Sequence, residues 1–364
     1  MPRGRKKTVT SADVAKLAGV SPASVTRVFN PDWEMNIRPE IRAKVMAAAN
    51  ELNYTPNAFA RMLAGHKTDL VAIVLGPVTG PYYSRVLLSF IYKLQMQGKQ
   101  VLPFTMAGGM SYRELFERIK PFRVDAIILT SAASPAVYEP NETDIPVILF
   151  EQVINGLSIH SVCSDSFAGG RTVAEMLVEN GHRRIAFISG NGICNQDFDR
   201  EYGFASRMNE YGLKVWRTEV GKYAHYDSGW DAAVRLLTGS ERPDAIFCAD
   251  DVLAMGAMDA IRDRFGLSVP DDISVVGFHD IQQASLPPYS LTTMHSPIDV
   301  MVDAVVGIID GLGEKSRENE RELFTMKPVI RNSMRIENPR YEQLRLAQLE
   351  TERPRRNTIN SAQL

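Results

Sequence analysis

The sequence predicts an α/β protein in which a small N-terminal helical head and a short hinge precede two lobes built on doubly wound parallel sheets. Two observations carry this prediction: helical apolar periodicity over the first 60 or so residues, and apolar runs alternating with helical segments from Leu70 onward. A chain of 364 residues with 45% hydrophobic content can build two or three domains with proper cores. We expect the head at residues 1–56, the hinge helix and linker at 57–68, the core at 69–337 and a flexible tail at 338–364.

Residues 8–30, TVTSADVAKLAGVSPASVTRVFN, predict two short helices joined by a glycine turn. Ser11 offers an N-cap hydroxyl to the first helix, and Gly19 ends it. Ser21 can cap the second helix, with Pro22 at its first position. Apolar residues at helical spacing give each helix a buried side: Val14, Leu17 and Ala18 in the first, and Val25, Val28 and Phe29 in the second. This pattern describes a helix-turn-helix, and the alternative is a plain helical hairpin within a core.

The second helix of a helix-turn-helix enters a DNA groove, so its outward side chains are candidates to contact bases and phosphates. They are Pro22, Ala23, Ser24, Thr26 and Arg27. Charge supports this interpretation, because residues 1–68 hold eleven Lys and Arg against five Asp and Glu, about +6. The whole chain carries only −2, so the remainder is near −8. The sequence therefore separates a phosphate-binding end from a body that DNA would repel.

A third helix and a hinge follow. Residues 39–52 read as a helix with one apolar face, formed by Ile41, Val45, Ala48, Ala49 and Leu52. A short helix can then start at Asn57 and end at Gly65, and it is too short to be stable alone. It is either a plain linker or a segment that orders on DNA. Leu63 beside Arg61 can wedge into a minor-groove step, or it can make a hydrophobic contact within the linker.

The core reads as two sets of strands alternating with helices. Apolar runs predict strands at 70–76, 100–106, 124–130, 146–151 and 160–165, and in the second half at 183–190, 213–220, 244–250 and 273–280. Helices are predicted at 83–97, 111–120, 167–180, 200–211, 228–238 and 251–265. This alternation describes two doubly wound α/β lobes with a cleft between them.

Such sheets bind ligands at the carboxyl ends of their strands. The candidate effector-binding residues at these ends are Tyr82, Tyr83, Glu151, Arg200, Asp250 and His279. Rings, an arginine and carboxylates suit a small polyhydroxylated ligand. The alternatives are structural: Asp165 and Asp251 can cap the helices that follow them, and the two tyrosines can be core residues.

Several functions are excluded by what the chain does not contain. No nucleophile elbow, phosphate loop or catalytic acid–base pair is present, so we expect neither an enzyme nor a cofactor. The three cysteines lack CxxC spacing and the histidines lack metal-ligand spacing, which leaves no case for a metal. No apolar run approaches the roughly 20 residues that span a bilayer, and the N-terminus lacks a secretion signal. We therefore expect a cytoplasmic protein without a membrane partner.

Six stretches of the chain resemble the lactose and galactose repressor family of bacterial transcription regulators, over about residues 8–337. VTSADVAKLAGVSPASVTRVFN resembles the family's head and ELNYTPNAFARMLAG its hinge helix. Its core is resembled by GHRRIAFISG, DAIFCADDVLAMGAMDAI, ISVVGFHDI and SLTTMHSP. The resemblance implies a homodimer whose paired heads read a palindromic double-stranded DNA operator, with Leu63 inserted in the minor groove. It also implies a core like periplasmic sugar-binding proteins. Lobe one would span 69–180 with 297–323, and lobe two 181–293 with 324–337.

The resemblance also assigns site residues. The candidate DNA contacts are Thr10, Ser21, Pro22, Ala23, Ser24, Thr26, Arg27, Asn30, Asn57, Arg61 and Leu63. Arg200 matches the family's effector-clamping arginine. Asp250 stands where the family often has asparagine, and His279 where it usually has aspartate. An imidazole in place of a carboxylate removes a negative charge beside Arg200, which favours an anionic effector such as gluconate or a related aldonate or uronate.

We therefore predict a repressor of carbohydrate catabolism genes that a sugar acid releases from its operator. Two alternatives keep the same architecture. The effector is a neutral sugar or a sugar phosphate, or the ligand acts as a corepressor instead of releasing the protein from DNA. A sugar-binding receptor or an enzyme without DNA regulation leaves the basic head unexplained. In the tail, Leu344, Leu346 and Leu349 do not sustain a heptad, so we expect a disordered basic extension rather than a coiled coil.

Overall fold

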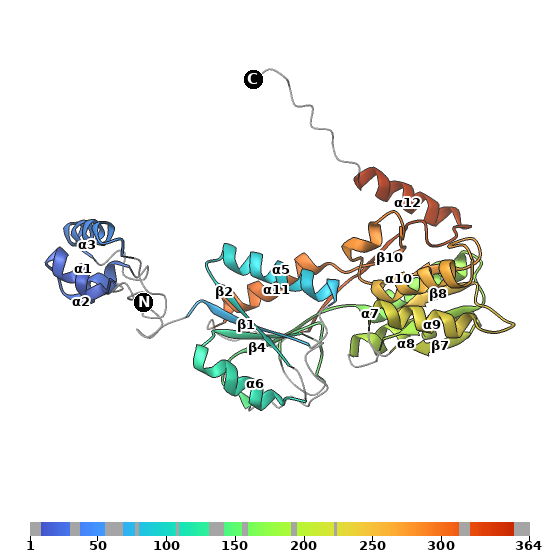
Figure 1. The fold of residues 1–364 in the computed structure, drawn as a ribbon, viewed down its shortest axis with the longest axis horizontal. Coiled ribbons are helices and arrows are strands. Elements are labelled where there is room, and N and C mark those ends of the chain that lie inside the picture. Colours follow the sequence, from blue (N-terminus) through green and yellow to red (C-terminus); the bar gives the residue numbers. More distant parts are fainter. Residues whose placement is uncertain are drawn as a thin grey trace, which may run out of the picture. The chain divides into compact units, whose positions relative to one another are not determined.

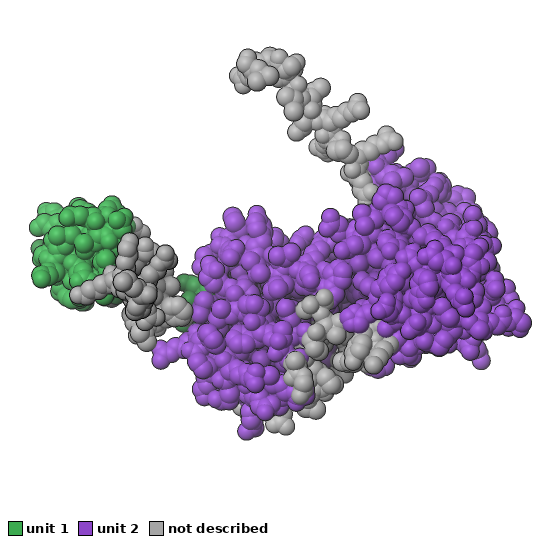
Figure 2. Space-filling view, in the orientation of Figure 1, with its two compact units in different colours: residues 1–69 green, residues 70–364 purple. Residues whose placement is uncertain are grey.

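The structure is a computed structural model that describes residues 9–29, 37–54, 68–76, 80–106, 109–130, 142–154, 159–190, 195–221, 224–312 and 321–352. It divides into two compact units, residues 1–69 and 70–364 (Figure 2). The parallel α/β architecture that the sequence predicts is confirmed, since a helical unit is followed by two parallel sheets covered by helices (Figure 1).

The described residues of the first unit form a head of three helices. Its helices are α1 (Ser11–Ala18), α2 (Pro22–Val28) and α3 (Pro39–Glu51). Small apolar residues from all three helices form its core: Val14, Ala15, Val25, Val28, Val45, Ala48 and Ala49. Leu17 was expected on the buried face, but it is 46% exposed, and the shorter Ala15 packs in the core instead.

Caps set the ends of the first two helices. The expectation for Ser11 was wrong by one residue, because Thr10 is the N-cap and Ser11 opens the helix. The Thr10 hydroxyl accepts from the Asp13 N–H while the Asp13 carboxylate accepts from the Thr10 N–H, a reciprocal pair that Ser11 could not form. Gly19 ends α1 with φ of 65°, and Ser21 caps α2 before Pro22, as predicted.

Lobe one is built on a six-stranded parallel sheet in the order β11-β5-β4-β3-β1-β2. Its strands are β1 (Leu70–Leu75), β2 (Gln100–Thr105), β3 (Ala126–Thr130), β4 (Val147–Phe150), β5 (Ser161–Ser164) and β11 (Arg321–Phe324). Helices α5 (Pro81–Met96) and α11 (Ile298–Gly311) lie side by side on one face and α6 (Tyr112–Ile119) on the other (Figure 1). β1 and β3 are buried on both faces, which explains their continuous apolar runs.

Lobe two has a four-stranded parallel sheet in the order β7-β6-β8-β9. Its strands are β6 (Ile185–Ser189), β7 (Arg217–Val220), β8 (Ala245–Cys248) and β9 (Ser274–Val276). Its helices are α7 (Ser166–Glu179), α8 (Asn195–Glu210), α9 (Tyr226–Leu237) and α10 (Asp251–Asp259), which a π-helical turn continues to Arg264. Helix α8 starts five residues before the predicted 200, so Arg200 lies in its second turn.

The structure corrects the lobe boundary expected at residue 180. Helix α7 packs against α8 of lobe two, and a Cβ at Gly170 would lie only 2.1 Å from the Arg200 carbonyl oxygen. This close approach explains why glycine stands there. The chain therefore passes from lobe one to lobe two near Asp165, between β5 and α7.

Two short strands lie at the other crossings between the lobes. β10 (Thr293–His295) and β12 (Lys327–Val329) pair antiparallel as a separate two-stranded sheet. β10 leads into α11 of lobe one, and β12 follows β11. The strands that join the lobes are thus hydrogen-bonded to each other.

The tail prediction was wrong for residues 339–352, which form helix α12 (Pro339–Glu352). Tyr341 is 3% exposed and its hydroxyl donates to Glu179 of α7 at 2.9 Å. The Gln348 amide accepts from the Ile330 N–H at 2.9 Å and donates to the Pro328 carbonyl at 2.7 Å, as a neighbouring strand would. These contacts depend on tertiary packing, which the absence of a heptad could not reveal. Residues 353–364 lie outside the described part.

Candidate DNA-binding surface and effector site

Helix α2 and its cap present an exposed face to solvent, and this is the face expected to contact DNA. Ser21, Pro22, Ala23, Thr26 and Arg27 are exposed and Ser24 is half-buried. The Ser21 hydroxyl accepts from the Ser24 N–H at 3.2 Å, and the Thr26 hydroxyl donates to the Pro22 carbonyl at 3.2 Å. The helix therefore offers fixed hydroxyl and methyl groups beside the guanidinium of Arg27.

Of the other expected DNA contacts, only Thr10 belongs to the described residues. It is exposed and holds the N-terminus of α1 through its cap with Asp13. Asn30 and the hinge residues Asn57, Arg61 and Leu63 lie outside the described residues.

The expected effector residues of lobe one form a buried cluster at the start of α5 and the end of β4. The Tyr82 hydroxyl donates to Glu151 Oε1 at 2.7 Å and lies 3.2 Å from Ser296 Oγ. Glu151, 4% exposed, also accepts from the hydroxyl and the N–H of Ser164. Burial and the Glu151 charge raise the pKa of Tyr82 well above its ordinary value, so this hydroxyl remains a donor.

The expected residues of lobe two form a hydrogen-bonded chain. His279 Nδ1 lies 3.0 Å from Asp250 Oδ2, and His279 Nε2 lies 3.2 Å from an Arg200 guanidinium nitrogen. Arg200 is 2% exposed, donates to the Ala249 carbonyl, and has its guanidinium carbon 3.9 Å from the centroid of the Phe278 ring. An aromatic face, a backbone carbonyl and the imidazole of His279 thus all contact this cation.

The two clusters meet where Tyr82 stacks on His279, with ring centroids 4.2 Å apart. Tyr83 packs edge-on against Tyr82 at 5.2 Å. The structure therefore brings all six expected effector residues into one region between the lobes.

Three non-glycine residues here have backbone angles in the left-handed region. The φ angles are 55° at Glu151, 102° at His279 and 56° at Asp280. Such conformations cost of order 1–3 kcal/mol each and persist where the surroundings hold them. Glu151 is held by the Ser164 bonds, and Asp280 accepts hydrogen bonds from His295 at 2.9 Å and Arg331 at 2.7 Å.

The alternative capping roles are settled by hydrogen bonds. Asp165 caps α7, since its Oδ1 accepts from the Ala168 N–H at 2.9 Å. At α10 the cap is Asp250, whose Oδ1 accepts from the Val252 N–H at 2.7 Å, while its Oδ2 faces His279. Asp251 is fully buried. It accepts hydrogen bonds from the Thr293 hydroxyl of β10 and from the Ile281 N–H, so it binds these segments rather than capping α10.

Sequence reasoning missed three residues of the site: Ser164, Ser296 and Phe278. Ser164 ends β5 and Phe278 follows β9, so the rule of strand carboxyl ends could have included both. Ser296 lies at the crossing between the lobes, and no local pattern distinguishes it from other serines.

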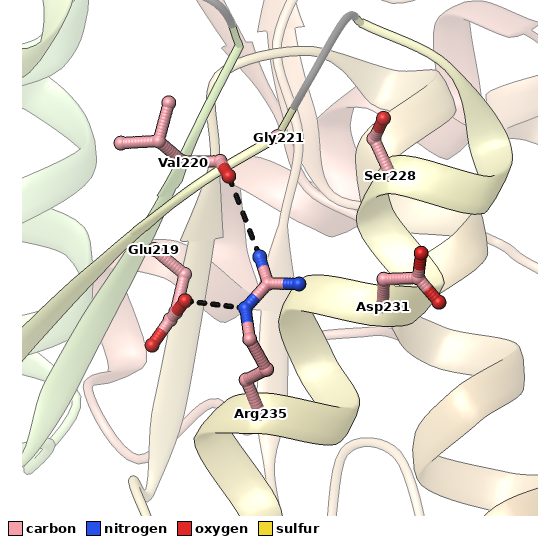
Figure 3. Close-up of a pocket in the computed structure, with 6 residues that line it drawn as sticks. All are labelled: Glu219, Val220, Gly221, Ser228, Asp231 and Arg235. Atoms are coloured by element: carbon pink, nitrogen blue, oxygen red, sulfur yellow. Dashed lines mark hydrogen bonds and ion pairs between the residues drawn. The ribbon is translucent and has the colours of Figure 1, made fainter.

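A surface depression of about 490 Å³ lies elsewhere in lobe two, between the edge strand β7 and α9 (Figure 3). It is lined by Glu219, Val220, Gly221, Ser228, Asp231 and Arg235. Arg235 donates to Glu219 at 2.7 Å and to the Val220 carbonyl at 3.4 Å, so its polar groups are partly satisfied within the wall. It includes none of the expected effector residues.

Two further observations concern the described residues only. None of their helices has the length and apolar character needed to cross a membrane. No group of three or more His, Cys, Asp or Glu among them could hold a metal ion.

Comparison with known proteins gives two family matches. Residues 10–57 match the model described as bacterial regulatory proteins, lacI family, and residues 174–334 match the periplasmic binding protein-like domain. The chain is 30% identical over 336 residues to the transcriptional repressor PurR of Pasteurella multocida, covering 90% of this chain and 98% of PurR. It is 31% identical over 306 residues to the ribose operon repressor of Escherichia coli, covering 82% and 92%.

Solved structures agree. A lac repressor dimer bound to operator and an anti-inducer superposes with a TM-score of 0.78 at 25% identity, over 90% of this chain and 99% of the repressor. A head with an exposed second helix, joined in one chain to a two-lobed core, is thus shared with DNA-binding repressors. This chain belongs to the lacI family of bacterial regulatory proteins, as a DNA-binding transcriptional repressor.

Proposed function

We propose that this repressor controls carbohydrate catabolism genes, binds a palindromic operator as a dimer, and is released by a carboxylate-bearing sugar derivative such as an aldonate or uronate. The observation that carries the choice of effector is the surroundings of Arg200. Its buried guanidinium donates to the Ala249 carbonyl and lies 3.2 Å from Nε2 of His279, the imidazole that stands where the family resemblance implies an aspartate. An effector carboxylate is a stronger acceptor and can bind a guanidinium with two hydrogen bonds.

The remaining groups suit a polyhydroxylated carbon skeleton. Glu151 and Asp250 can accept hydrogen bonds from hydroxyls, Ser296 can donate or accept, and the face of Tyr82 can pack against C–H groups. A ribose operon repressor and a cellobiose complex of the regulator CelR occur among the similar proteins, which supports a carbohydrate-derived effector.

On the DNA side, Pro22 and Ala23 are too short and apolar for bidentate base contacts. We therefore expect them to read thymine methyl groups or groove shape, while Arg27 contacts a base edge or phosphate. Thr10 and Ser21 would orient the two helices through their caps. Asn30 would contact the DNA beside α2, and Asn57, Arg61 and Leu63 would act in the minor groove.

Release by the effector requires that the ligand distinguish two arrangements of the lobes. A sugar acid held by Arg200 and His279 of lobe two and by Tyr82 and Glu151 of lobe one would favour one such arrangement. We propose that this arrangement has the lower operator affinity, which makes the ligand an inducer.

The test of the effector class is a thermal-shift series. Gluconate, galacturonate, glucose and glucose 6-phosphate are added singly to the full-length protein at one pH and salt concentration. A ligand that binds only the native state raises the melting temperature. We expect a rise with one of the sugar acids. A rise with glucose or glucose 6-phosphate alone would contradict the proposal.

A further inference from the structure

We infer that Asp280 is a positioning residue that couples effector binding to the arrangement of the lobes, because it ties His279 to two of the segments that join the lobes. The inference rests on the proposed effector site, since His279 is one of its residues. It applies to any carbohydrate derivative bound there, so it does not depend on the choice of a sugar acid.

The Asp280 carboxylate bonds both segments at once. Its Oδ2 accepts a hydrogen bond from Nδ1 of His295 at 2.9 Å, and its Oδ1 accepts one from the Arg331 guanidinium at 2.7 Å. His295 is the last residue of β10, just before the chain enters α11 of lobe one, and Arg331 follows β12 by two residues. A single side chain therefore holds two of the crossings.

Further hydrogen bonds join the same segments. The His279 N–H donates to the Met294 carbonyl of β10 at 2.9 Å. Arg331 donates to the Leu291 carbonyl, which lies just before β10, at 2.8 Å. The chain at His279 and Asp280 is thus bonded to β10 through its backbone and through a side chain, and Arg331 is bonded to both.

These contacts extend to Tyr82 of lobe one. Tyr82 packs on His279 with ring centroids 4.2 Å apart, and its hydroxyl lies 3.2 Å from Ser296 Oγ. His279 directly precedes Asp280 in the chain, and Ser296 directly follows His295. The bond between Asp280 and His295 therefore fixes two of the groups around Tyr82 relative to each other.

Asp280 holds this position against two costs. Its φ angle of 56° lies in the left-handed region, and its side chain is only 15% exposed. Burial raises the pKa of its carboxyl, but the hydrogen bond from His295 and the charge of Arg331 outweigh burial and bring the pKa below its ordinary value. The group is therefore a carboxylate at neutral pH, and its two hydrogen bonds are of the stronger, charge-assisted kind.

Coupling requires that a residue that contacts the ligand cannot move without moving the segments between the lobes. With Asp280 in place, a displacement of His279 by an effector also displaces β10 and the segment after β12. Without this carboxylate, an effector can still bind to Arg200 and Asp250, but the lobes are less constrained to follow. The expected consequence is weaker release from DNA even at saturating effector.

Operator binding with and without saturating effector measures this coupling. Gluconate, galacturonate, glucose and glucose 6-phosphate are each added to the full-length wild type with a labelled operator, and the compound that weakens the complex most is used. The coupling factor is the ratio of the operator dissociation constants with and without that compound, typically about 5 to 150. We expect a factor at least about threefold smaller in Asp280→Asn.

His295→Gln provides a second variant. It removes the Nδ1 donor to Asp280 and leaves the six proposed effector residues unchanged. We expect it to reduce the coupling factor too. The double variant should have a factor no smaller than that of Asp280→Asn, because both substitutions break the same bond.

Asp244→Asn is the matched control, and the melting temperature of each variant is measured beside its coupling factor. Asp244 also lies next to a histidine, with its Oδ1 3.5 Å from His182 Nδ1, but it precedes β8 and so lies at the amino ends of the lobe-two strands. Its Oδ2 accepts from the N–H groups of Arg183 and Arg184. The substitution should lower the melting temperature and leave the coupling factor unchanged.

The outcomes separate the inference from the proposed function. If a sugar acid releases the wild type and the factor is unchanged in both Asp280→Asn and His295→Gln, the inference is overturned and the effector class stands. A reduced factor measured with glucose or glucose 6-phosphate supports the inference and contradicts the effector class. An equal reduction in Asp244→Asn reflects lost stability and overturns the inference. If none of the four compounds weakens the wild-type complex, both fail.

Discussion

The phenol ring of Tyr82 lies against the imidazole of His279, with planes inclined by 25°. Tyr82 belongs to α5 of lobe one, and His279 follows β9 of lobe two. A change in the angle between the lobes must therefore alter this stack, whereas the bond from Tyr82 to Glu151 lies within lobe one. This contact therefore joins two residues of the proposed effector site that belong to different lobes.

Tyr82→Phe tests the hydroxyl. The substitution leaves the ring stack but removes a donor to the buried Glu151 carboxylate. Loss of a hydrogen bond to a buried charged group costs about 1–3 kcal/mol, so urea unfolding should show a loss of stability in that range. Tyr92→Phe is the control, because Tyr92 is 63% exposed on the same helix and should change stability by less than about 0.5 kcal/mol.

Arg200→Lys tests the clamp. Lysine keeps the charge but loses the planar fork that contacts Ala249, His279 and the Phe278 ring. We expect operator binding without effector to persist, while the sugar acid concentration needed for release rises about 10- to 100-fold. An Arg200→Lys protein released at the wild-type concentration would show that the guanidinium does not hold the effector.

Arg27→Ala tests the recognition helix. Arg27 is exposed in the last turn of α2 and is not one of the apolar residues of the head's core, so the head should remain folded. Operator affinity should fall by about 1–3 kcal/mol if the side chain reads a base. Lys214→Ala removes one exposed positive charge from the core and is the control, with little change expected in fluorescence anisotropy with labelled operator.

Helix α12 should stabilise the core. Removal of residues 339–364 deletes the Tyr341–Glu179 bond and both Gln348 bonds next to β12. We expect a lower melting temperature, whereas removal of residues 353–364 alone deletes none of these bonds and should leave it unchanged. Equal melting temperatures for the two truncated chains would contradict the packing of α12 described above.

Acid should weaken the contact between α7 and α8. Hydrogen bonds from Arg171 and Arg207 lower the pKa of Glu210 from its ordinary 4.5 to about 2. A depressed carboxyl pKa contributes stability that is complete above the unfolded value and is lost as pH falls toward the folded value. The stability difference between wild type and Glu210→Gln should therefore be constant above about pH 5 and shrink toward pH 2. A difference that does not vary with pH would contradict this ion-pair role.

The sequence predicted the fold well where local signals and burial agree. Strands such as β1 and β3 are continuous apolar runs because both faces are covered, and Ser21 with Pro22 marks the start of α2. The sequence did not predict the features that depend on contacts between residues far apart in the chain. Nothing near Gly170 indicates that α7 packs on α8, and α12 depends on Glu179, Pro328 and Ile330, which are distant in the chain.

The site was predictable as a set of residues but not as a network. The carboxyl ends of the strands pointed to Glu151, Asp250 and His279, because parallel sheets bring those ends together. That Asp250 both caps α10 and holds His279 Nδ1 could not be read from spacing, since it depends on the left-handed backbone at His279.

The central claim is that a metabolite bound between the lobes controls DNA binding by the head. The most direct measurement is the affinity of the full-length protein for a palindromic operator duplex and for a scrambled duplex, at one salt concentration, with and without gluconate or galacturonate. We predict preference for the palindrome and a weaker complex when the sugar acid is present. Equal affinity for the two duplexes, or an operator complex that neither sugar acid weakens, would contradict the account.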